Sequence, residues 1–292
     1  MAHMKKIVFT TMCLGAVVGT LGLGFKQSPA QAQNDGPKTI KPDCWVPSFS
    51  DEFNTLDYWD PKKKTGQWKT SYIWDRDTII NEELQYYIDP VEHGVSPFNI
   101  NDGILNIVAD KTPASLQQKV KGQEYISGVL TTENGFSQKY GRFEVFAKVP
   151  TGKGLWSAFW LLPSFDQWPQ GVAILPEIDV MEYLGNEGKS YHTTLHTNQN
   201  GPLESHPYQH TLKSDPSEDF HLYSVIWTAE KVEWYFDKNL VASHDTPKDY
   251  TKPVHFLLNL AVGGAWAGKP DSTTSFPASY SIDYVRAYTN KC

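Results

Sequence analysis

Several features that would indicate other classes of protein are missing from this sequence. Long helical periodicity is absent, which argues against a helical bundle. An excess of basic residues is also missing, since 26 Lys and Arg stand against 33 Asp and Glu. We therefore expect no nucleic-acid partner, because such proteins present a basic surface. Charged residues make up only 20% of the chain and hydrophobic residues 40%, which allows a sizeable core and argues against wholesale disorder.

The N-terminus has the features of a secretory signal peptide. A short basic region, Lys5 and Lys6, precedes an apolar, Gly-rich run from Ile7 to Phe25, and Ala30-Gln31-Ala32 forms a small-x-small cleavage site. We predict a signal peptide over residues 1–32, the alternative being a membrane anchor. Residues 1–3 are set aside as a cloning remnant or an upstream start. No later stretch is apolar enough to span a bilayer, so we expect a secreted or periplasmic protein with no membrane partner after cleavage.

Only two cysteines follow the predicted cleavage site. Cys44 and Cys292 lie near the two ends of the mature chain, and an exported protein can form disulfides. Pairing would tie the termini together and stabilise the fold by on the order of 4–5 kcal/mol through loop entropy. The alternative is two free thiols, and the sequence leaves both open.

After a polar linker over residues 33–42, the pattern indicates one domain of short strands over residues 43–292. Aromatic residues reach 13% and Gly and Pro are plentiful, a mix that favours strands and turns. A continuous apolar run, as in residues 255–262, is typical of a central strand buried on both sides. We predict an all-β sandwich with strands over residues 104–108, 142–149, 225–227, 232–236, 240–242, 255–262 and 282–288.

Three acidic residues stand among strand-forming residues in the segment EIDVME. On a helix, Glu177 and Glu182 would lie about 140° apart and could not share a site. On a regular strand, Glu177 and Asp179 share a face but Glu182 points away, because side chains alternate. One extra residue, a β-bulge near Val180-Met181, would return Glu182 to that face.

With such a bulge, this spacing suits glycosidic chemistry. The two glutamate carboxyl groups could approach to about 5–5.5 Å, the separation that retaining glycosidases use. Mutual repulsion among three acids should raise the pKa of at least one, as a proton donor near neutral pH requires. The alternative, a solvated acidic sheet edge, fits poorly with the apolar flanking residues.

The segment PEIDVMEYLG at residues 176–185 resembles the signature of family 16 glycoside hydrolases, in the bulged form of laminarinase- and lichenase-like members. Supporting motifs follow in order along residues 45–290: SDEF, NEELQYY, YGRFE, GLWSAFWLLP, NLAVGGAW and IDYVRAY. The resemblance implies a jelly-roll sandwich of two antiparallel sheets with an open concave cleft. It implies Glu177 as nucleophile, Glu182 as general acid/base, and Asp179 between them. No redox or organic cofactor is required for this chemistry.

The resemblance also implies residues that bind the sugar chain. Trp and Tyr can stack on the apolar faces of sugar rings. Five candidates for the cleft are Trp156, Trp160, His196, Asn81 and Trp266, with Trp74 and Arg76 as further ones. The alternatives are core packing for the tryptophans and a structural role for the histidine. Trp227 and Trp234 are assigned to the core, and the spacing of His192 and His196 does not indicate zinc, because the segment is β-prone and lacks the HExxH glutamate.

Family members of this kind hold a calcium ion on the convex face. The match points to Glu52, the carbonyl of Gly103, and Asp283 as oxygen ligands, which suit calcium. The alternative is that these acids are solvated or paired.

The predicted function is that of a secreted, retaining endo-β-glucanase with a polysaccharide as its partner, acting as a monomer on β-1,3 or mixed β-1,3/1,4 glucans. Many laminarinase-like members carry an Arg two residues after the Ser of this Ser-Gly motif, whereas here Ser127-Gly128 is followed by Val129. Many members also have an aromatic residue directly after the matching His, whereas here Thr197 follows His196. These departures, and a resemblance of the N-terminal stretch to succinoglycan-type depolymerases, leave a bacterial exopolysaccharide as an alternative substrate. A non-catalytic lectin on the same scaffold is the remote alternative.

Overall fold

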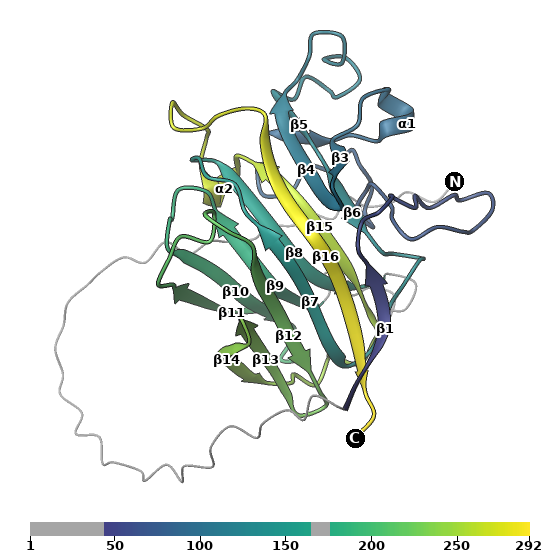
Figure 1. The fold of residues 1–292 in the computed structure, drawn as a ribbon, viewed down its shortest axis with the longest axis vertical. Helices are drawn as coiled ribbons and strands as arrows, with labels where there is room; N and C mark the ends of the chain where they lie inside the picture. The colour runs from purple at the N-terminus through teal and green to yellow at the C-terminus, as the bar shows by residue number, and fades with distance from the viewer. Residues whose placement is uncertain (1–43, 165–175) are drawn as a thin grey trace, which may run out of the picture.

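The fold consists almost entirely of strands in two sheets that pack face to face (Figure 1). The structure, a computed structural model, describes residues 44–164 and 176–292. The predicted signal peptide (1–32) and linker (33–42) lie outside the described residues. The two short helices are α1 (Pro90–His93) and α2 (Gly264–Ala267). Neither these helices nor any other within the described ranges has the length and apolar character needed to cross a bilayer.

The larger sheet has ten strands in the order β14-β13-β12-β7-β16-β4-β5-β2, with β1 paired to β16 and β3 paired to β4. The pairing is antiparallel except between β2 and β5. Its strands are β1 (Trp45–Asp51), β2 (Gln85–Tyr87), β3 (Phe98–Asn101), β4 (Ile104–Lys111), β5 (Tyr125–Ser127), β7 (Gly141–Lys148), β12 (His221–Trp227), β13 (Lys231–Phe236), β14 (Asn239–Asp245) and β16 (Ala278–Asn290).

The smaller sheet has six antiparallel strands in the order β11-β10-β9-β8-β15-β6. They are β6 (Val129–Thr131), β8 (Leu155–Pro163), β9 (Glu177–Leu184), β10 (Ser190–Thr197), β11 (Glu204–Thr211) and β15 (Val254–Val262). Strands β8 to β11 are neighbours both in the chain and in the sheet, whereas β15 comes from much later in the chain and pairs with β8 and β6. The predicted jelly-roll sandwich of two antiparallel sheets is confirmed.

All seven segments predicted as strands correspond to strands of the structure, with residue 149 alone lying just past its strand. The strands are β4, β7, β12, β13, β14, β15 and β16.

Alternation of side chains fixes which face of each strand enters the core. Every residue of β15 is buried, as its continuous apolar run predicted. Phe256, Leu258 and Leu260 enter the core between the sheets, whereas Leu257 belongs to a smaller apolar cluster on the opposite face. Trp227 and Trp234 are fully buried in the main core, as expected.

The two ends of the described chain are joined covalently. Cys44 and Cys292 form a disulfide with their Cα atoms 5.4 Å apart, and β1 runs antiparallel to β16 beside it (Figure 1). The open choice between a disulfide and two free thiols is thus resolved in favour of the disulfide. It closes a loop with a sequence separation of 248 residues, so it restricts the unfolded chain over nearly the whole domain.

Removing this disulfide should destabilise the domain without changing its architecture. We expect the Cys44→Ser/Cys292→Ser variant to lose about 2–5 kcal/mol of unfolding free energy, because the unfolded chain regains loop entropy. Denaturant unfolding measures the loss. The wild type in reducing agent should match the variant, and the variant itself should not respond to reductant. Equal stability of variant and wild type would show that the crosslink contributes nothing.

Candidate active site

A β-bulge in β9 brings the three acids of EIDVME to one face. Across to β8, Phe159 pairs with Met181 but Trp160 pairs with Asp179, so β9 has one extra residue. The pairing with β10 shifts at the same place. Val180 and Met181, the two residues at the shift, are both buried in the main core. The predicted bulge is therefore present, and Glu182 returns to the face of Glu177 and Asp179.

Cross-strand pairing shows what shares that face. On β10, His196 pairs with Glu177, Thr194 with Asp179, and His192 with Glu182. These three β10 residues are two apart and so point the same way. On β8, Trp160 pairs with Asp179 and Ala158 with Glu182. The predicted face-sharing of Trp156 and Trp160 follows from the same alternation.

His196 joins two of the acids. Its Nε2 lies 3.1 Å from Asp179 Oδ2 and 4.0 Å from Glu177 Oε1, and its Nδ1 lies 2.8 Å from Ser205 Oγ. The structure thus places His196 beside the acids, where the family resemblance put it. Burial alone would lower the pKa of His196, but the hydrogen bond and the charge of Asp179, with Glu177 and Glu182, raise it to about 9. His196 is therefore an imidazolium near neutral pH.

Burial distinguishes the two glutamates. Glu182 is 9% exposed and accepts a hydrogen bond from Thr194 Oγ1 at 3.2 Å, whereas the Glu177 side chain keeps 29% of its surface exposed. Burial and the Asp179 charge raise the pKa of Glu182 to about 8, although His196, Thr194 and Trp156 oppose the rise. Burial and the Asp179 charge also raise the pKa of Glu177 well above its usual range, and the charge of His196 opposes that rise. The pKa directions therefore do not separate the roles of the two glutamates, whereas the geometry places both carboxyl groups on one face beside His196.

Two residues that sequence reasoning missed hold the backbone of this site. The hydroxyl of Tyr250 lies 2.6 Å from the Glu177 carbonyl and 2.8 Å from the His196 carbonyl, so it links β9 to β10. The indole Nε1 of Trp234, in the opposite sheet, donates to the Asp179 carbonyl at 2.9 Å. Main-chain contacts of this kind leave no signal in the sequence, because any residue supplies the carbonyl.

Aromatic side chains continue the site beyond Glu182. Trp266, in α2, stacks edge-on against Trp156 with ring centroids 5.1 Å apart and against His192 at 4.9 Å. Trp156 and Trp266 are both half-buried. His192 Nε2 lies 2.5 Å from Glu187 Oε2 and stands four residues from His196 on one strand, too far to share a zinc ion.

A second aromatic group lies on the Asp179 side. Trp160 is only 7% exposed, and its ring centroid lies 5.6 Å from Tyr72 and 6.4 Å from Trp74. Trp160 therefore lies at the bottom of this aromatic group, and the ring of the half-buried Trp74 is more accessible to solvent than that of Trp160. Asn81 lies in the loop before β2, in a left-handed conformation (φ 54°), and its side chain donates to Glu83. Binding of sugar by Trp156, Trp160, Trp266, His196 and Asn81 stays a prediction.

The predicted calcium ligands meet at one junction in the larger sheet. Strands β4 and β1 follow each other along the same edge of β16, pairing with residues 278–282 and 285–290. Gly103 precedes β4 and Glu52 follows β1, so both adjoin Asp283 in the gap. The Glu52 carboxylate, however, accepts hydrogen bonds from Nε and Nη2 of Arg286, both at 2.8 Å. The junction therefore fits an ion held by Asp283 and main-chain oxygens better than one held by the Glu52 carboxylate.

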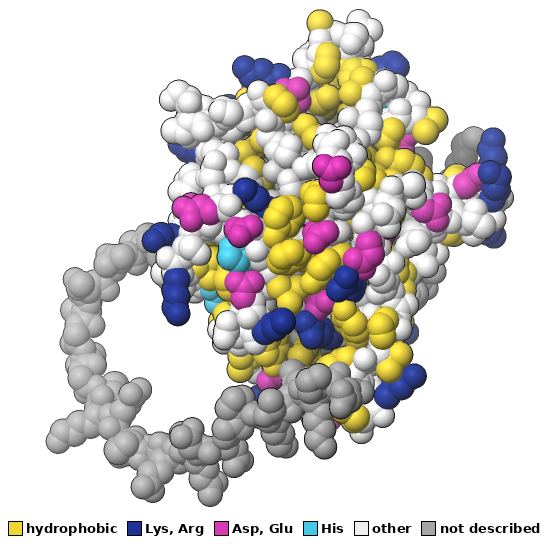
Figure 2. Space-filling view, viewed as in Figure 1, with side chains coloured by type: hydrophobic (Ala, Val, Ile, Leu, Met, Phe, Trp, Pro, Cys, Tyr) yellow, Lys and Arg dark blue, Asp and Glu magenta, His cyan; other side chains and the backbone are white. Residues whose placement is uncertain are grey.

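Charge elsewhere on the surface shows no concentration of one sign on the side viewed in Figure 2. There Lys and Arg side chains are scattered among acidic and apolar ones.

Comparison with known protein families gives one clear match. Residues 91–286 match the family model described as glycosyl hydrolases family 16. The chain is 38% identical over 249 residues to the endo-1,3-1,4-beta-glycanase ExsH of Rhizobium meliloti (strain 1021), covering 83% of this chain and 51% of that protein. It is 31% identical over 299 residues to a beta-glucanase of Rhodothermus marinus, covering 96% of this chain and 93% of that protein. The chain thus spans about half the length of the Rhizobium relative.

Two of the solved structures that are similar to this chain are laminarinases. The laminarinase catalytic domain of Thermotoga maritima MSB8 superposes with a TM-score of 0.69 at 31% identity, covering 85% of this chain and 99% of that one. The laminarinase of Rhodothermus marinus superposes with a TM-score of 0.67 at 29% identity, covering 84% and 98%.

The buried charges predict how stability depends on pH. A folded pKa of about 8 for Glu182 lies above its unfolded value, so its protonated form stabilises the fold and stability falls as pH rises. His196, raised to about 9, acts in the same direction, because its protonated form is favoured in the fold. Burial lowers the pKa of His210 to about 4 and of His255 to about 3, so these two act in the opposite direction up to about pH 6.5. We therefore expect the unfolding temperature to fall between about pH 7 and pH 9.

Glu182→Gln should remove part of this pH dependence. We expect the variant to unfold about 5 °C above the wild type at pH 8 and close to it at pH 5, because Gln is neutral at both values. Calorimetry at the two pH values measures the difference, with Glu124→Gln, an exposed glutamate, as control. A parallel shift at both pH values would show that Glu182 does not titrate in this range.

Proposed function

Because the chain belongs to family 16 of the glycosyl hydrolases, we propose that it is a secreted, retaining endo-hydrolase of β-1,3 or mixed β-1,3/1,4 glucans. The observation that carries this proposal is the bulge in β9. It places Glu177, Asp179 and Glu182 on one face of the smaller sheet, beside aromatic side chains suited to sugar rings. A polysaccharide is thus the partner that we propose.

The chemistry follows from the different surroundings of the two glutamates. Glu182, protonated by virtue of its burial, gives its proton to the glycosidic oxygen while the Glu177 carboxylate attacks the anomeric carbon. A covalent glycosyl-enzyme forms and the leaving sugar departs with its hydroxyl. Glu182, now ionised, takes a proton from water, and the resulting attack releases Glu177 and the product with the original anomeric configuration.

Asp179 and His196 tune this exchange. Asp179, 3% exposed, lies 3.1 Å from the His196 imidazolium, so its negative charge is paired. The imidazolium in turn opposes the rise of the pKa of both Glu177 and Glu182. The His196 imidazolium thus favours the ionised form of both glutamates, which Glu177 needs as nucleophile and Glu182 needs when it takes a proton from water, whereas the Asp179 charge acts in the opposite direction.

Two other functions remain to be separated by experiment. The departures at Val129 and Thr197, together with the resemblance of the N-terminal stretch to succinoglycan-type depolymerases, favour an exopolysaccharide as the alternative substrate. A lectin would need the aromatic residues but not two glutamates in differing environments. Reducing-end release from laminarin, barley β-glucan and succinoglycan separates the three, since a lectin releases sugar from none of them.

Substitution of either glutamate should abolish turnover and leave the fold intact. We expect Glu177→Gln and Glu182→Gln each to lower kcat by about 10³-fold or more, because each removes a group that bonds or protonates the reacting atoms. Initial rates on whichever polysaccharide the wild type cleaves, with circular dichroism to verify folding, measure the effect. Glu124→Gln should retain full activity. A variant that keeps near-wild-type turnover would remove that residue from its role.

We further propose that the junction at Asp283 holds a structural calcium ion. The supporting observation is the gap between β1 and β4 along β16, which contains Asp283 and adjoins Gly103. Chelation with EDTA should lower the unfolding temperature of the wild type, by about 5 °C if binding contributes 1–2 kcal/mol, and calcium should restore it. Asp283→Asn should unfold at the lower temperature with or without EDTA. No shift in the wild type would contradict the proposal.

A further inference from the structure

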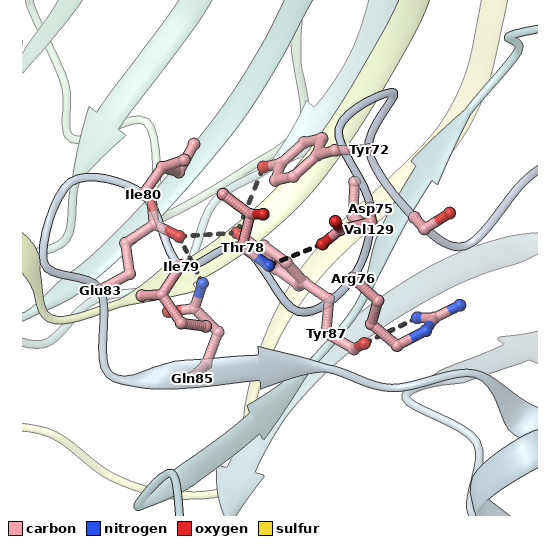
Figure 3. Close-up of a pocket in the computed structure, with 11 residues that line it drawn as sticks. Tyr72, Asp75, Arg76, Thr78, Ile79, Ile80, Glu83, Gln85, Tyr87 and Val129 are labelled. Atoms are coloured by element: carbon pink, nitrogen blue, oxygen red, sulfur yellow. Dashed lines mark hydrogen bonds between the residues drawn. The ribbon is translucent and has the colours of Figure 1, made fainter. Parts of the chain in front are cut away.

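A fourth buried carboxylate lies near the site but outside the acidic trio. Glu83 lies two residues before β2 and is 5% exposed. Its oxygens accept hydrogen bonds from Gln85 Nε2 at 2.5 Å and the Tyr87 hydroxyl at 3.5 Å (Figure 3). They also accept one from Asn81 Nδ2 at 3.1 Å. Three donors thus converge on one carboxylate. Burial raises the pKa of Glu83 to about 7, and these three hydrogen bonds oppose that rise.

From Glu83 a chain of side chains reaches the floor of the proposed cleft. The Tyr87 hydroxyl accepts from Asn259 Nδ2 at 3.1 Å, and Asn259 Oδ1 accepts from Trp160 Nε1 at 2.8 Å. All four members are buried. Trp160 pairs with Asp179 across β8 and β9, so the chain ends next to the acidic trio.

The donor and the acceptor of each hydrogen bond between Glu83 and Trp160 follow from the chemistry of these two end residues. An indole N–H can only donate, so Asn259 must present its oxygen to Trp160 and its amide N–H to Tyr87. Tyr87 accepts that bond and a second one from the Tyr72 hydroxyl at 3.4 Å, which leaves its own hydroxyl proton to donate to Glu83. An ionised carboxylate can only accept, so it completes the chain without conflict.

The same carboxylate also fixes the loop that contains Asn81. Gln85 Oε1 accepts from the backbone N–H of Val262 at 2.7 Å, so its amide N–H must face Glu83. The Asn81 carbonyl accepts from the backbone N–H of Ala265, next to Trp266, at 2.9 Å. Glu83 is therefore connected to the segments that carry Asn81, Trp160 and Trp266, three of the predicted sugar-binding residues.

We propose that Glu83 is a positioning residue for glycan binding, whose carboxylate fixes Trp160 through Tyr87 and Asn259 and fixes Asn81 directly. This inference rests on the proposed function. Glu83 itself touches no reacting atom. Its loss should therefore weaken substrate binding and leave the chemical step, which Glu177 and Glu182 carry, nearly unchanged.

The test compares Glu83→Gln, Tyr87→Phe and the double variant of the full chain with Glu124→Gln as matched control. Gln in place of Glu83 keeps one acceptor oxygen and replaces the other by an NH2 donor, so it cannot accept from Asn81, Gln85 and Tyr87 together. Phe at position 87 removes the hydroxyl that links Glu83 to Asn259. We expect KM for laminarin or barley β-glucan, whichever the wild type cleaves faster, to rise about fivefold to tenfold in both single variants. We expect kcat to change by less than about twofold. Both substitutions interrupt the same series of hydrogen bonds between Glu83 and Trp160. KM of the double variant should therefore be no higher than the KM of the poorer single variant.

Several outcomes would overturn the proposal. Glu83→Gln with the KM of the wild type would do so, as would a fall in kcat with KM unchanged. Additive effects in the double variant would show that Glu83 does not act through Tyr87. If Glu83→Gln does not fold, Tyr87→Phe decides, because it leaves the contacts of Glu83 with Gln85 and Asn81 in place.

Failure of the proposed function gives a different result. A wild type that releases sugar from no glucan would refute hydrolysis, yet laminarihexaose affinity measured by calorimetry would still report on the positioning. In that case an affinity fivefold or more weaker in Tyr87→Phe would support the role of Glu83, and an unchanged affinity, or no binding to the wild type, would refute it.

Discussion

One extra residue in β9 is the constraint on which the site depends. Without it, Glu182 would point into the core between the sheets, where an acid would be buried without a partner. The structure accommodates the insertion by placing both Val180 and Met181 on the core side, where each is almost fully buried. The apolar residues thus anchor the bulge, and the acids on either side of it face the same way.

Bringing the acids together has an electrostatic cost that the structure offsets only in part. Three carboxyl groups on one sheet face repel each other and lose water, and the His196 imidazolium returns one positive charge. The loss of water and the Asp179 charge, which His196 offsets only in part, raise the pKa of Glu182 to about 8. The same raised pKa that costs stability near neutral pH supplies a proton donor, so stability and reactivity oppose each other at this residue.

Around this centre, the rest of the fold restricts movement. Trp234 and Tyr250 hold the backbone of β9 from the opposite sheet and from the loop after β14. The Glu83 carboxylate gathers the loop before β2 against the cleft floor. Far from the site, the disulfide between Cys44 and Cys292 and the junction at Asp283 hold β1 and β16 together. Precise placement of reacting groups requires such support, because small displacements weaken catalysis strongly.

The sequence by itself indicated seven strand segments, the sandwich and the acidic motif, because side-chain alternation and a one-residue insertion are local patterns. It also indicated which acids face each other, since Glu177, Asp179 and Glu182 are close along one strand. Only the tertiary structure decided the contacts of His196 with Asp179, the pairing of Glu52 with Arg286 and the burial of Trp160 under Tyr72 and Trp74. These join segments distant in the chain, where spacing carries no information. Glu83 is the clearest example. Its neighbours in the sequence show only an acid shortly before a strand. Folding brings Asn259 to Tyr87, and Asn259 then links Glu83 to Trp160.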